Sequence, residues 1–479
     1  MAEQTKAYRY QRVAGRIENM IREGTLKSGS RIPSLRDMSS LMGVSLNTVR
    51  EAYSTLEAQY LIEAVPQSGY FVRTLQKELK ALPAVDPSRN DPENVSLCRV
   101  MSNYQEAGGL DSETQMGVSS LSAGFYPSAQ LARILQDVAR NSGSLAFDYH
   151  MPPGYRPLRD QVARINGEEG TCFQADDVVM TNGCHEAVFM ALQVLCKPGD
   201  TVAVESPCYF NFFQMLEALN LNVVEIPSVS GDGFSIDTLR FVLETQKISV
   251  FFCIPNFSNP LGTCLSLEKK SDLVRLLHEF SVPMIEDDIY GSLYFGNNRP
   301  PTCYSLAEKD DVILCSSFSK NLGPGLRTGW IVPGKYREDI IRLKTLLNLG
   351  NNSIQELCLA RYLEGRSYVK HMKKIRSILG RQMLQARKSI IESFPSGTRV
   401  SSPEGGLVFW VTLPGVFDSM ELYRQGMKEN LFFAPGKLFS LKRDYSSSLR
   451  LNGGNWNPKT EEAVRRLGVL AASVASQTL

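Results

Sequence analysis

A single lysine, Lys320, stands among residue types suited to covalent chemistry on a carbonyl carbon. The stretch 315–330 reads CSSFSKNLGPGLRTGW, with hydroxyls at Ser317 and Ser319 and a guanidinium at Arg327. A lysine that attacks a carbonyl needs a pocket that excludes water and neighbours that lower its pKa. Hydroxyls and a guanidinium are the donors that suit a phosphate monoester. Together they indicate pyridoxal 5′-phosphate (PLP); the alternative is a strand-to-loop corner with a solvated lysine.

The elements that must position this lysine alternate along the chain from about residue 119. Short apolar runs are separated by helical stretches such as Glu186–Leu195 and Leu267–Phe280. The runs are Val178–Met180, Thr201–Val204, Asn222–Glu225, Val250–Ile254, Met284–Ile285 and Val312–Leu314. This alternation predicts an α/β domain with a largely parallel sheet. Ligands of such sheets bind at the carboxyl ends of the strands.

Residues with suitable chemistry follow four of these runs. Gly183 begins a helix, where backbone N–H groups favour an anion. Tyr209 follows the next run, Asn259 lies in an Asn-Pro-x-Gly turn, and Asp287 and Tyr290 follow a buried run. Each signal is weak alone, because a core tyrosine and an ordinary tight turn are equally good readings of two of them. Acidic residues directly after a buried strand are uncommon and indicate a purpose.

In their order along the chain, these motifs resemble the fold-type-I aminotransferases over residues 115–479. The order is Gly-Cys at a helix start, then P-x-Y, N-P-x-G, D-x-x-Y, S-x-S-K and an arginine. The resemblance implies that Lys320 forms an aldimine with the cofactor and that Asp287 pairs with its pyridinium nitrogen. It also implies that Asn259 and Tyr290 hydrogen-bond the phenolic oxygen of the ring, and that Tyr209 stacks on the ring face.

The same resemblance assigns the phosphate and the substrate. Phosphate ligands would be side chains of one segment and two backbone N–H groups: Ser317, Ser319, Arg327, Gly183 and Cys184. Cys184 departs from the family, which often has a hydroxyl there, so one phosphate hydrogen bond is expected to be missing. Tyr149 matches a tyrosine that reaches the phosphate of a neighbouring subunit, which implies a homodimer. Arg450, after a small-domain start at Pro403–Gly406, matches the arginine that binds an α-carboxylate.

The first eighty residues predict a separate small module. Apolar spacing predicts a helix over 10–23, Ser34 with Asp37 resembles a capping box that begins a second helix, and Ser45 begins a third. The turn at Gly43-Val44 between the last two has helix-turn-helix spacing. Residues 61–64 and 70–73 then read as two strands of a wing.

Residues 8–74 closely resemble the winged helix-turn-helix of GntR-type transcription regulators. In that module the third helix enters the major groove of DNA. The resemblance implies DNA contacts from the third helix, the second helix and the wing: Ser45, Asn47, Thr48, Arg50, Arg36, Gln67 and Gly69. Leu46 stands where the family commonly has an arginine, so base readout there is apolar or absent. The alternative is a three-helix cap used for protein contacts only.

Composition is that of an ordinary globular protein. The chain has 479 residues, 43% hydrophobic and 21% charged, and a net charge of +2. Residues 1–80 hold 12 Lys and Arg against 8 Asp and Glu, a weak hint of a nucleic-acid partner. The polar start, the absence of a long apolar run and scattered cysteines without a Cys-x-x-Cys pair predict a cytoplasmic protein with reduced thiols. Residues 75–114, rich in proline, predict a linker.

A winged helix joined to an aminotransferase body is the arrangement of the MocR subfamily of GntR-type regulators. The expected function is a homodimeric, PLP-dependent regulator in which an amino-acid-like or amine effector attacks the Lys320 aldimine. Closure of the large domain would then move the winged helices and alter operator affinity. Two alternatives stay open: a working aminotransferase with a secondary DNA module, since the catalytic residues are complete, and a regulator that senses PLP itself.

Overall fold

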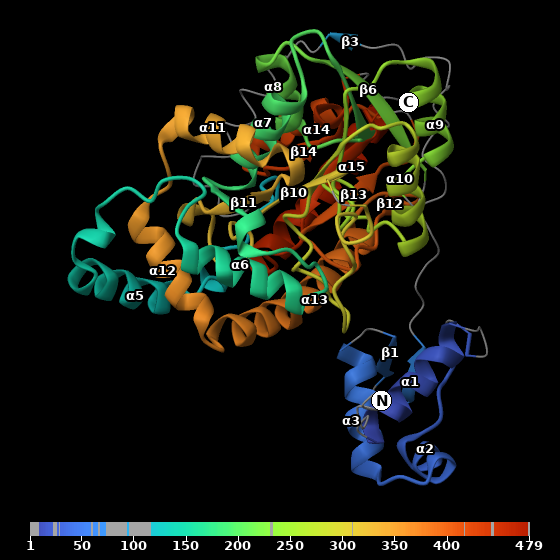
Figure 1. Cartoon of the computed structure of the whole chain (residues 1–479). Helices are drawn as coiled ribbons and strands as arrows, with labels where there is room; N and C mark the ends of the chain where they lie inside the picture. Colours follow the sequence, from blue (N-terminus) through green and yellow to red (C-terminus); the bar gives the residue numbers. More distant parts are fainter. Residues whose placement is uncertain are drawn as a thin grey trace. The chain divides into compact units, whose positions relative to one another are not determined.

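The computed structural model describes two compact units of the chain. It describes residues 9–22, 26–27, 29–58, 61–65, 68–72, 93–94, 116–229, 233–308, 310–415, 417–441 and 445–477. The units separate between residues 78 and 79 (Figure 1). Within the described residues, no helix is both long and apolar enough to cross a membrane.

The N-terminal unit is a three-helix module with a two-stranded wing. Its elements are α1 (Arg9–Arg22), α2 (Leu35–Met42), α3 (Leu46–Ala58), β1 (Ile62–Val65) and β2 (Gly69–Val72). Helix α2 begins with the predicted capping box between Ser34 and Asp37 and ends at Gly43, whose φ of 62° suits glycine. Buried apolar side chains at helical spacing on α1 and α3, such as Ile17 and Tyr53, form its core.

The larger unit is built on a nine-stranded mixed sheet. The strand order is β3-β6-β5-β8-β9-β10-β11-β4, and β7 pairs with β6. Five central strands are parallel: β6 (Asn222–Val229), β5 (Thr201–Ser206), β8 (Val250–Cys253), β9 (Met284–Asp287) and β10 (Val312–Ser317). The flanking strands β3 (Glu93–Asn94), β7 (Gly233–Phe234), β11 (Gly329–Val332) and β4 (Val179–Thr181) are antiparallel to their neighbours. The parallel centre was predicted; the antiparallel flanks were not.

Alternating side chains of the central strands bury both faces of this sheet. Phe251 packs in one apolar cluster with α9 (Ile236–Thr245) and α10 (Leu267–Glu279), while its neighbour Phe252 packs in the other with α7 (Cys184–Leu195) and α8 (Phe210–Ala218). Helices α9 and α10 lie together at one side of the unit in Figure 1. The period of two that defines a strand therefore places helices on both faces.

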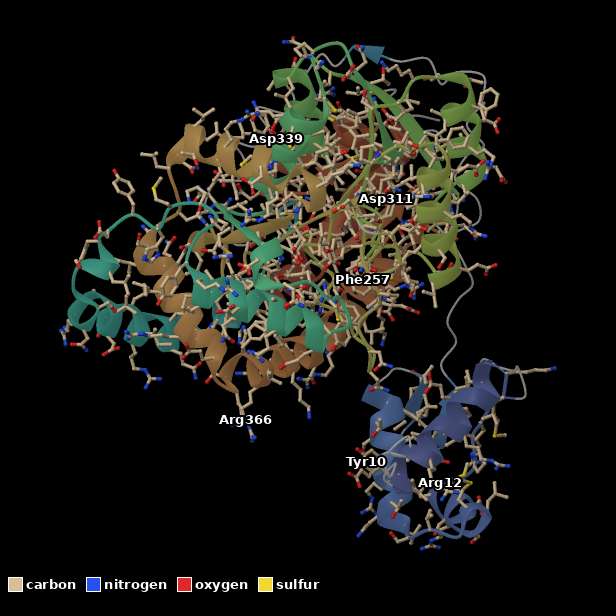
Figure 2. All side chains as sticks on the ribbon, viewed as in Figure 1. Tyr10, Arg12, Phe257, Asp311, Asp339 and Arg366 are labelled. Atoms are coloured by element: carbon tan, nitrogen blue, oxygen red, sulfur yellow. The ribbon has the colours of Figure 1, made fainter. Side chains whose placement is uncertain are left out.

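The remaining helices frame the large unit. They are α5 (Ser128–Asn141), α6 (Arg156–Glu168), α11 (Arg337–Asn348), α12 (Ser353–Glu364) and α13 (Ser367–Ser393). Helix α12 packs on α5 and α6, and the exposed Arg366 projects from the corner between α12 and α13 (Figure 2). Short 3₁₀ turns connect several of them: η2 (Ala123–Phe125), η3 (Gly143–Ala146), η4 (Ala175–Asp177), η5 (Pro324–Leu326) and η6 (Gly334–Tyr336).

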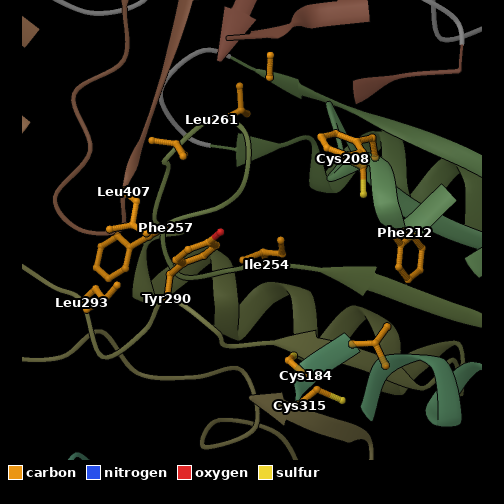
Figure 3. Close-up of a cluster of buried hydrophobic side chains, with 14 of the residues drawn as sticks. Cys184, Cys208, Phe212, Ile254, Phe257, Leu261, Tyr290, Leu293, Cys315 and Leu407 are labelled. Atoms are coloured by element: carbon orange, nitrogen blue, oxygen red, sulfur yellow. The ribbon is translucent and has the colours of Figure 1, made fainter. Parts of the chain in front are cut away.

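The C-terminal part forms a second, four-stranded antiparallel sheet in the order β12-β13-β15-β14. The strands are β12 (Arg399–Val400), β13 (Val408–Thr412), β14 (Ala434–Pro435) and β15 (Ser448–Asn452), with α14 (Ser419–Lys428), η7 (Gly436–Phe439) and α15 (Pro458–Gln477). Its apolar side chains join the same core cluster as the large sheet. Figure 3 shows where they meet, with Leu407 beside Phe257, Leu293 and Tyr290.

The segment Met116–Ser122, which precedes η2, is not helical. It runs along β15 instead, where the backbone N–H of Asn452 donates to the carbonyl of Met116 at 2.7 Å. Its small residues Gly117, Ser119 and Ser120 give no helical periodicity, so other contacts decide its conformation. Residues 95–115 lie outside the described residues.

Candidate functional site

Lys320 lies in the turn after β10, half-buried at the wall of a pocket of about 680 Å³. Its Nζ donates to the carbonyl of Ser119 at 2.5 Å and stands 5.8 Å from the ring centre of Tyr290. Burial, then the positive charges of Arg450 and Arg327, lower the pKa of Lys320 to about 8, against the opposing carboxylate of Asp287. About a tenth of the amine is therefore neutral at pH 7, far more than for an ordinary lysine, and the neutral form is the nucleophile.

Asp287 ends β9, directly beside Cys315 of β10 in the parallel register. Its Oδ1 accepts hydrogen bonds from the thiol of Cys184 at 3.2 Å and from the backbone N–H of Ile289 at 3.0 Å. Burial raises the pKa of Asp287 to about 6, and these hydrogen bonds oppose the rise. The carboxyl group is therefore predominantly ionised at pH 7 and can hold a proton on a basic nitrogen.

A chain of hydrogen bonds connects Tyr290 to Arg450 across the pocket. The hydroxyl of Tyr290 shares a 2.7 Å hydrogen bond with Ser119 Oγ and accepts one from Asn259 Nδ2 at 3.4 Å. Asn259 Oδ1 in turn accepts from Arg450 Nη1 at 2.8 Å. Tyr209, at the start of α8, is half-buried in the same wall, and burial raises its pKa.

A cradle for an anion lies at the start of α7. Gly183 caps this helix with a φ of 95°, and a Cβ added there would come within 2.6 Å of Arg327 Nη2. Arg327 donates to the carbonyl of Asn182 at 2.8 Å and to Ser319 Oγ at 3.4 Å, and the N–H of Ser319 donates to Ser317 Oγ at 3.3 Å. The positive end of a helix, two hydroxyls and a guanidinium therefore converge, which fits a phosphate.

Arg450 lies in the middle of β15 and is buried, with 2% of its surface exposed. Its Nη2 donates to the carbonyl of Gly117. Its Nε has no hydrogen-bond partner among the described residues, although it is buried. A buried guanidinium with an unpaired N–H is suited to bind an anionic group.

The structure brings together ten of the twelve predicted cofactor and substrate residues in this pocket. They are Lys320, Asp287, Tyr290, Asn259, Tyr209, Ser317, Ser319, Arg327, Cys184 and Arg450. Gly183 lies against Arg327 at the pocket's edge. Tyr149 does not line the pocket; it is 73% exposed on the segment between η3 and α6. Its neighbours are fixed by Glu356, which accepts from the N–H of Tyr155 at 2.9 Å and lies 3.2 Å from His150 Nδ1.

Sequence reasoning missed several residues of the pocket wall. They include Gly117, Val118, Ser119, Ser120, His185, Phe210 and Phe212. The backbone carbonyls of Gly117 and Ser119 make the contacts with Arg450 and Lys320, and no motif marks a backbone carbonyl. The thiol of Cys184 was expected only as a missing phosphate donor, and its hydrogen bond to Asp287 was not foreseen.

The predicted DNA contacts cluster at the start of α3 and around it. Ser45 Oγ accepts from the N–H of Thr48 at 3.2 Å, and Arg50 Nη1 donates to Asn47 Oδ1 at 3.3 Å. Leu46, the first residue of α3, is 44% exposed. Arg36 is exposed on α2, and Gly69 begins β2 with a φ of 104°. Gln67 lies outside the described residues.

Comparisons with known families match both units. The family of aminotransferases of class I and II matches residues 117–467, and the gntR family of bacterial regulatory proteins matches residues 9–72. The uncharacterized HTH-type transcriptional regulator YdcR of Escherichia coli is 33% identical over 463 residues, which cover 96% of this chain and 98% of that protein.

Solved structures match the larger unit. The kynurenine aminotransferase of Pyrococcus horikoshii, solved with PMP, superposes with a TM-score of 0.73 at 26% identity, covering 79% of this chain and 95% of that one. LysN, the α-aminoadipate aminotransferase of Thermus thermophilus, was solved with N-(5′-phosphopyridoxyl)-L-leucine. It superposes with a TM-score of 0.72 at 24% identity, covering 80% and 100% of the two chains, a likeness of fold.

Proposed function

This chain belongs to the MocR subfamily of GntR-type transcription regulators, in which a helix-turn-helix domain is fused to a class I and II aminotransferase domain, and we propose that its pocket is the sensor of that regulator. The near full-length match to a transcription regulator favours this function over that of a metabolic enzyme, because it spans the DNA-binding unit as well as the pocket. The effector is an amino-acid-like ligand or an amine. Its binding alters the affinity of the N-terminal unit for operator DNA.

The cofactor of this fold is PLP, and the pocket fits it. When bound, PLP supplies a carbon that amines attack and a ring that withdraws electrons from the adduct. The cradle formed by Gly183, Ser319 and Arg327 would hold its phosphate, together with Ser317 and the backbone N–H of Cys184. This fit rests on the close approach of Arg327 to Gly183, which leaves no room for a side chain at that position.

The chain's own residues then take distinct roles. Asp287, an ionised carboxylate at pH 7, would hold a proton on the ring nitrogen. Asn259 and Tyr290 would donate to the phenolic oxygen, and Tyr209 would cover the ring face. Lys320 would hold the cofactor covalently and yield its place to the amine of the effector. Its lowered pKa favours the neutral amine, which can leave the cofactor, act as a base and return.

One observation carries the proposal: Lys320 and Arg450 lie in the same pocket of a chain that also has a DNA-binding unit. The first would yield its place on the cofactor to the amine of the ligand, and the second would bind the ligand's carboxylate. A ligand that binds one state of the protein better than another shifts the population toward that state. A differential affinity of about 1 kcal/mol or more between the states would be enough to register as regulation.

The experiment has two steps. The visible absorbance of the purified protein, scanned against the twenty amino acids and simple amines, identifies ligands that displace Lys320. Operator binding is then titrated with such a ligand in the wild type and in Lys320→Ala. We expect Lys320→Ala to lose the ligand response, while Lys335→Ala, a change at an exposed lysine, keeps it. An undiminished response in Lys320→Ala would refute the sensor, and a response to PLP alone would make the cofactor the signal.

For the DNA-binding unit we propose direct base contact by the start of α3. Asn47 and Arg50 are exposed and hydrogen-bonded to each other, which orients both toward a groove. Ser45 and Thr48 would bind phosphates or bases beside them, Arg36 would reach the DNA from α2, and the wing with Gln67 and Gly69 would lie along the minor groove. The compartment we propose is the cytoplasm, where operator DNA is accessible.

We further propose that the protein acts as a homodimer. Exposed apolar side chains gather on both sides of the contact between residues 148–151 and 349–353, where a Cβ on Gly350 would come within 2.4 Å of the His150 carbonyl. These side chains form what we call the apolar flank: Leu145, Phe147, Tyr149, Met151, Leu346, Leu347 and Leu349. Patches of this kind mark protein interfaces. In a dimer Tyr149 would be placed to reach the partner's phosphate.

A second candidate function is a working aminotransferase. It is favoured by a specific observation, since Lys320, Asp287, Tyr209 and Arg450 all face one pocket. Steady-state transamination with an amino donor and a 2-oxo acid separates the two functions. Turnover on the order of 1–1,000 per second would identify a metabolic enzyme. A slow half-reaction without turnover would support the sensor.

A further inference from the structure

Residues 116–120, here called the strap, form part of the pocket wall, where Gly117, Val118, Ser119 and Ser120 line it. The strap is fixed to the second sheet by Asn452, whose Nδ2 donates to the carbonyls of Val118 at 2.6 Å and Ser120 at 2.7 Å. The backbone N–H of Asn452 donates to the carbonyl of Met116 at 2.7 Å. Asn455 Nδ2 adds a 2.8 Å bond to Ser120. The strap is therefore held by hydrogen bonds to its backbone along its whole length.

Two carbonyls of the strap accept hydrogen bonds from two of the three cationic side chains of the pocket, Lys320 and Arg450. Ser119 accepts from Lys320 Nζ, and Gly117 accepts from Arg450 Nη2. A ligand amine would take the place of Lys320 on the cofactor, and the carboxylate of the same ligand would bind Arg450. The strap is also linked to the cofactor wall, because Ser119 Oγ bonds the hydroxyl of Tyr290 that is visible in Figure 3.

The guanidinium of Arg450 is only partly hydrogen-bonded to the protein. A guanidinium offers a carboxylate the edge formed by Nε–H and the Nη2–H on the same side, which takes both oxygens in parallel. On Arg450 the opposite Nη1 is bound to Asn259, Nη2 is bound to Gly117, and the buried Nε has no partner among the described residues. A single carbonyl oxygen thus stands where a carboxylate would place two.

We propose that the strap is a built-in stand-in for the ligand's carboxylate and must leave Arg450 when a carboxylate binds. A carboxylate makes two charge-assisted hydrogen bonds on this edge and satisfies Nε, whereas the Gly117 carbonyl makes one. The exchange is therefore favourable. This inference rests on the proposed sensor function and extends it to the class of ligand and to the part of the protein that responds.

Two consequences follow for recognition. An amine without a carboxylate can replace Lys320 on the cofactor, but it does not compete with the Gly117 carbonyl for Arg450. The strap therefore stays in place. An amino carboxylate displaces it. In the sequence, residues 73–115 lie between the strap and the described part of the DNA-binding unit. The strap makes the site distinguish amino acids from amines.

The test uses a pair of probes that differ only in the carboxylate. Full-length protein freed of cofactor is loaded with N-(5′-phosphopyridoxyl)-L-leucine or with N-(5′-phosphopyridoxyl)-3-methylbutylamine. Both present the same phosphate, ring and apolar side chain, and neither requires Lys320 to react. Stoichiometric loading is checked by the absorbance of the pyridoxyl group.

Hydrogen exchange at the amides of Asn452 and Ser122 reports the strap directly. The first amide donates to Met116, and the second donates to Asn455 Oδ1 at 2.6 Å. With the leucine adduct we expect these amides to exchange at least about tenfold faster than with the amine adduct, which corresponds to the loss of one good hydrogen bond. Equal exchange with both adducts, each fully loaded, would overturn the proposal.

A variant tests the strap without any ligand. Asn452→Ala removes both side-chain bonds to the strap, and Asn455→Ala removes a third from outside the sheet. We expect either change to raise exchange of the Asn452 amide, which donates to Met116, and to move operator affinity toward the value of the leucine-adduct complex. Asn222→Ala is the matched control, because Asn222 also donates to a backbone carbonyl, that of Gly199, outside the pocket. If both strap variants behave like this control, the strap does not transmit the signal.

The outcomes separate this inference from the function on which it rests. If the leucine adduct changes operator affinity while strap exchange is the same for both adducts, the sensor stands and the strap inference fails. If strap exchange responds to the carboxylate while operator affinity ignores both adducts, the strap inference stands as ligand recognition and the sensor function fails.

Discussion

At the scale of residues, burial decides the charge of the carboxyl groups beneath the pocket. Glu205 in β5 is 2% exposed and accepts a 2.9 Å hydrogen bond from the N–H of Ile254. Burial raises the pKa of Glu205 to about 8, so this side chain is predominantly protonated at neutral pH. Asp287, with a pKa of about 6, is ionised under the same conditions. Two acids on strands β5 and β9, which are separated by β8 in the same sheet, thus carry different charges, and only the second can hold a proton for a ligand.

Replacing Glu205 with glutamine should remove a pH dependence of stability. The folded-state pKa is raised above the ordinary 4.5, so the stability from the neutral form is complete below pH 4.5 and is lost as pH rises through about 8. Relative to Glu205→Gln, the wild type should lose on the order of 1 kcal/mol per pH unit in this window. Thermal unfolding at pH 6, 7 and 8 measures this difference. Glu462→Gln, at an exposed glutamate, is the control, and parallel curves for Glu205→Gln and wild type would contradict the assignment.

Arg50 should carry sequence discrimination and no cofactor function. A bidentate contact of arginine with a base is worth about 1–3 kcal/mol of discrimination. We expect Arg50→Ala to lower the preference for the operator over scrambled DNA by that amount and to leave the PLP absorbance unchanged. Competition binding measures the preference. Arg366→Ala, at an exposed arginine of the larger unit, should leave it intact, and an unchanged preference in Arg50→Ala would exclude Arg50 as a reader.

Side-chain chemistry could be predicted from the sequence, whereas backbone chemistry could not. Lys320, Asp287 and Arg450 belong to sequence motifs whose residue types indicate a chemical role. The structure places all three in one pocket. Gly117 and Ser119 accept hydrogen bonds from Arg450 and Lys320 through their backbone carbonyls, and every residue has such a carbonyl. Only the path of the chain in space brings them to Lys320 and Arg450, and no local pattern encodes that path.

At the scale of elements, α2 owes its start to a reciprocal pair of side-chain contacts. Ser34 Oγ accepts from the N–H of Asp37 at 3.3 Å, and Asp37 Oδ2 accepts from the N–H of Ser34 at 3.3 Å. Both satisfy N–H groups that a helix leaves unpaired at its start. The capping box was readable because it depends on residues three positions apart.

Ser34→Ala should destabilise the N-terminal unit by about 1 kcal/mol, the usual cost of losing such a cap. Hydrogen exchange of α2 in the full-length protein, followed against urea, reports this change while α7 in the larger unit serves as an internal reference. Ser40→Ala, an exposed serine of the same helix, should have no comparable effect. Equal exchange in Ser34→Ala and Ser40→Ala would show that the cap contributes little.

The strands of the large sheet show which elements could be predicted from local sequence and which could not. All six apolar runs became strands, β4, β5, β6, β8, β9 and β10. All but β4 are parallel, and a buried parallel strand reads as a continuous apolar run. β11 was missed, since glycines and a proline precede it and its pairing partners, β10 and β4, are 12 or more residues away in sequence. Antiparallel pairing at the flank of a sheet is decided by tertiary contacts, which local residue patterns do not carry.

At the scale of the whole molecule, the apolar flank is the feature that the larger unit's own folding does not explain. Leu346 is 79% exposed and Phe147 is 73% exposed, on neighbouring segments. Large exposed apolar side chains gathered on neighbouring segments are typical of a protein interface. A second copy of the chain is the partner that the proposed role of Tyr149 requires.

Leu346→Glu and Phe147→Glu should each shift the protein from dimer toward monomer, because a charge would be buried in the interface. Sedimentation velocity across a range of concentrations measures the shift, and we expect at least about a tenfold weaker dimer. Val469→Glu is the matched control, since Val469 is 70% exposed on α15 and outside the apolar flank. A monomeric wild type, or a dimer indifferent to both changes, would contradict the homodimer.

The two asparagines that hold residues 116–120 also give the regulator an adjustable set point. A ligand that binds only after this segment has been released has an apparent affinity equal to its intrinsic affinity multiplied by the released fraction. Asn452 and Asn455 govern that fraction but contact neither Lys320 nor Arg450 among the described hydrogen bonds. Substitutions at these positions therefore change the concentration at which the regulator responds without changing what it recognises. Sensitivity and specificity are separable properties of this pocket, and evolution or design can alter the first while the chemistry of the second stays fixed.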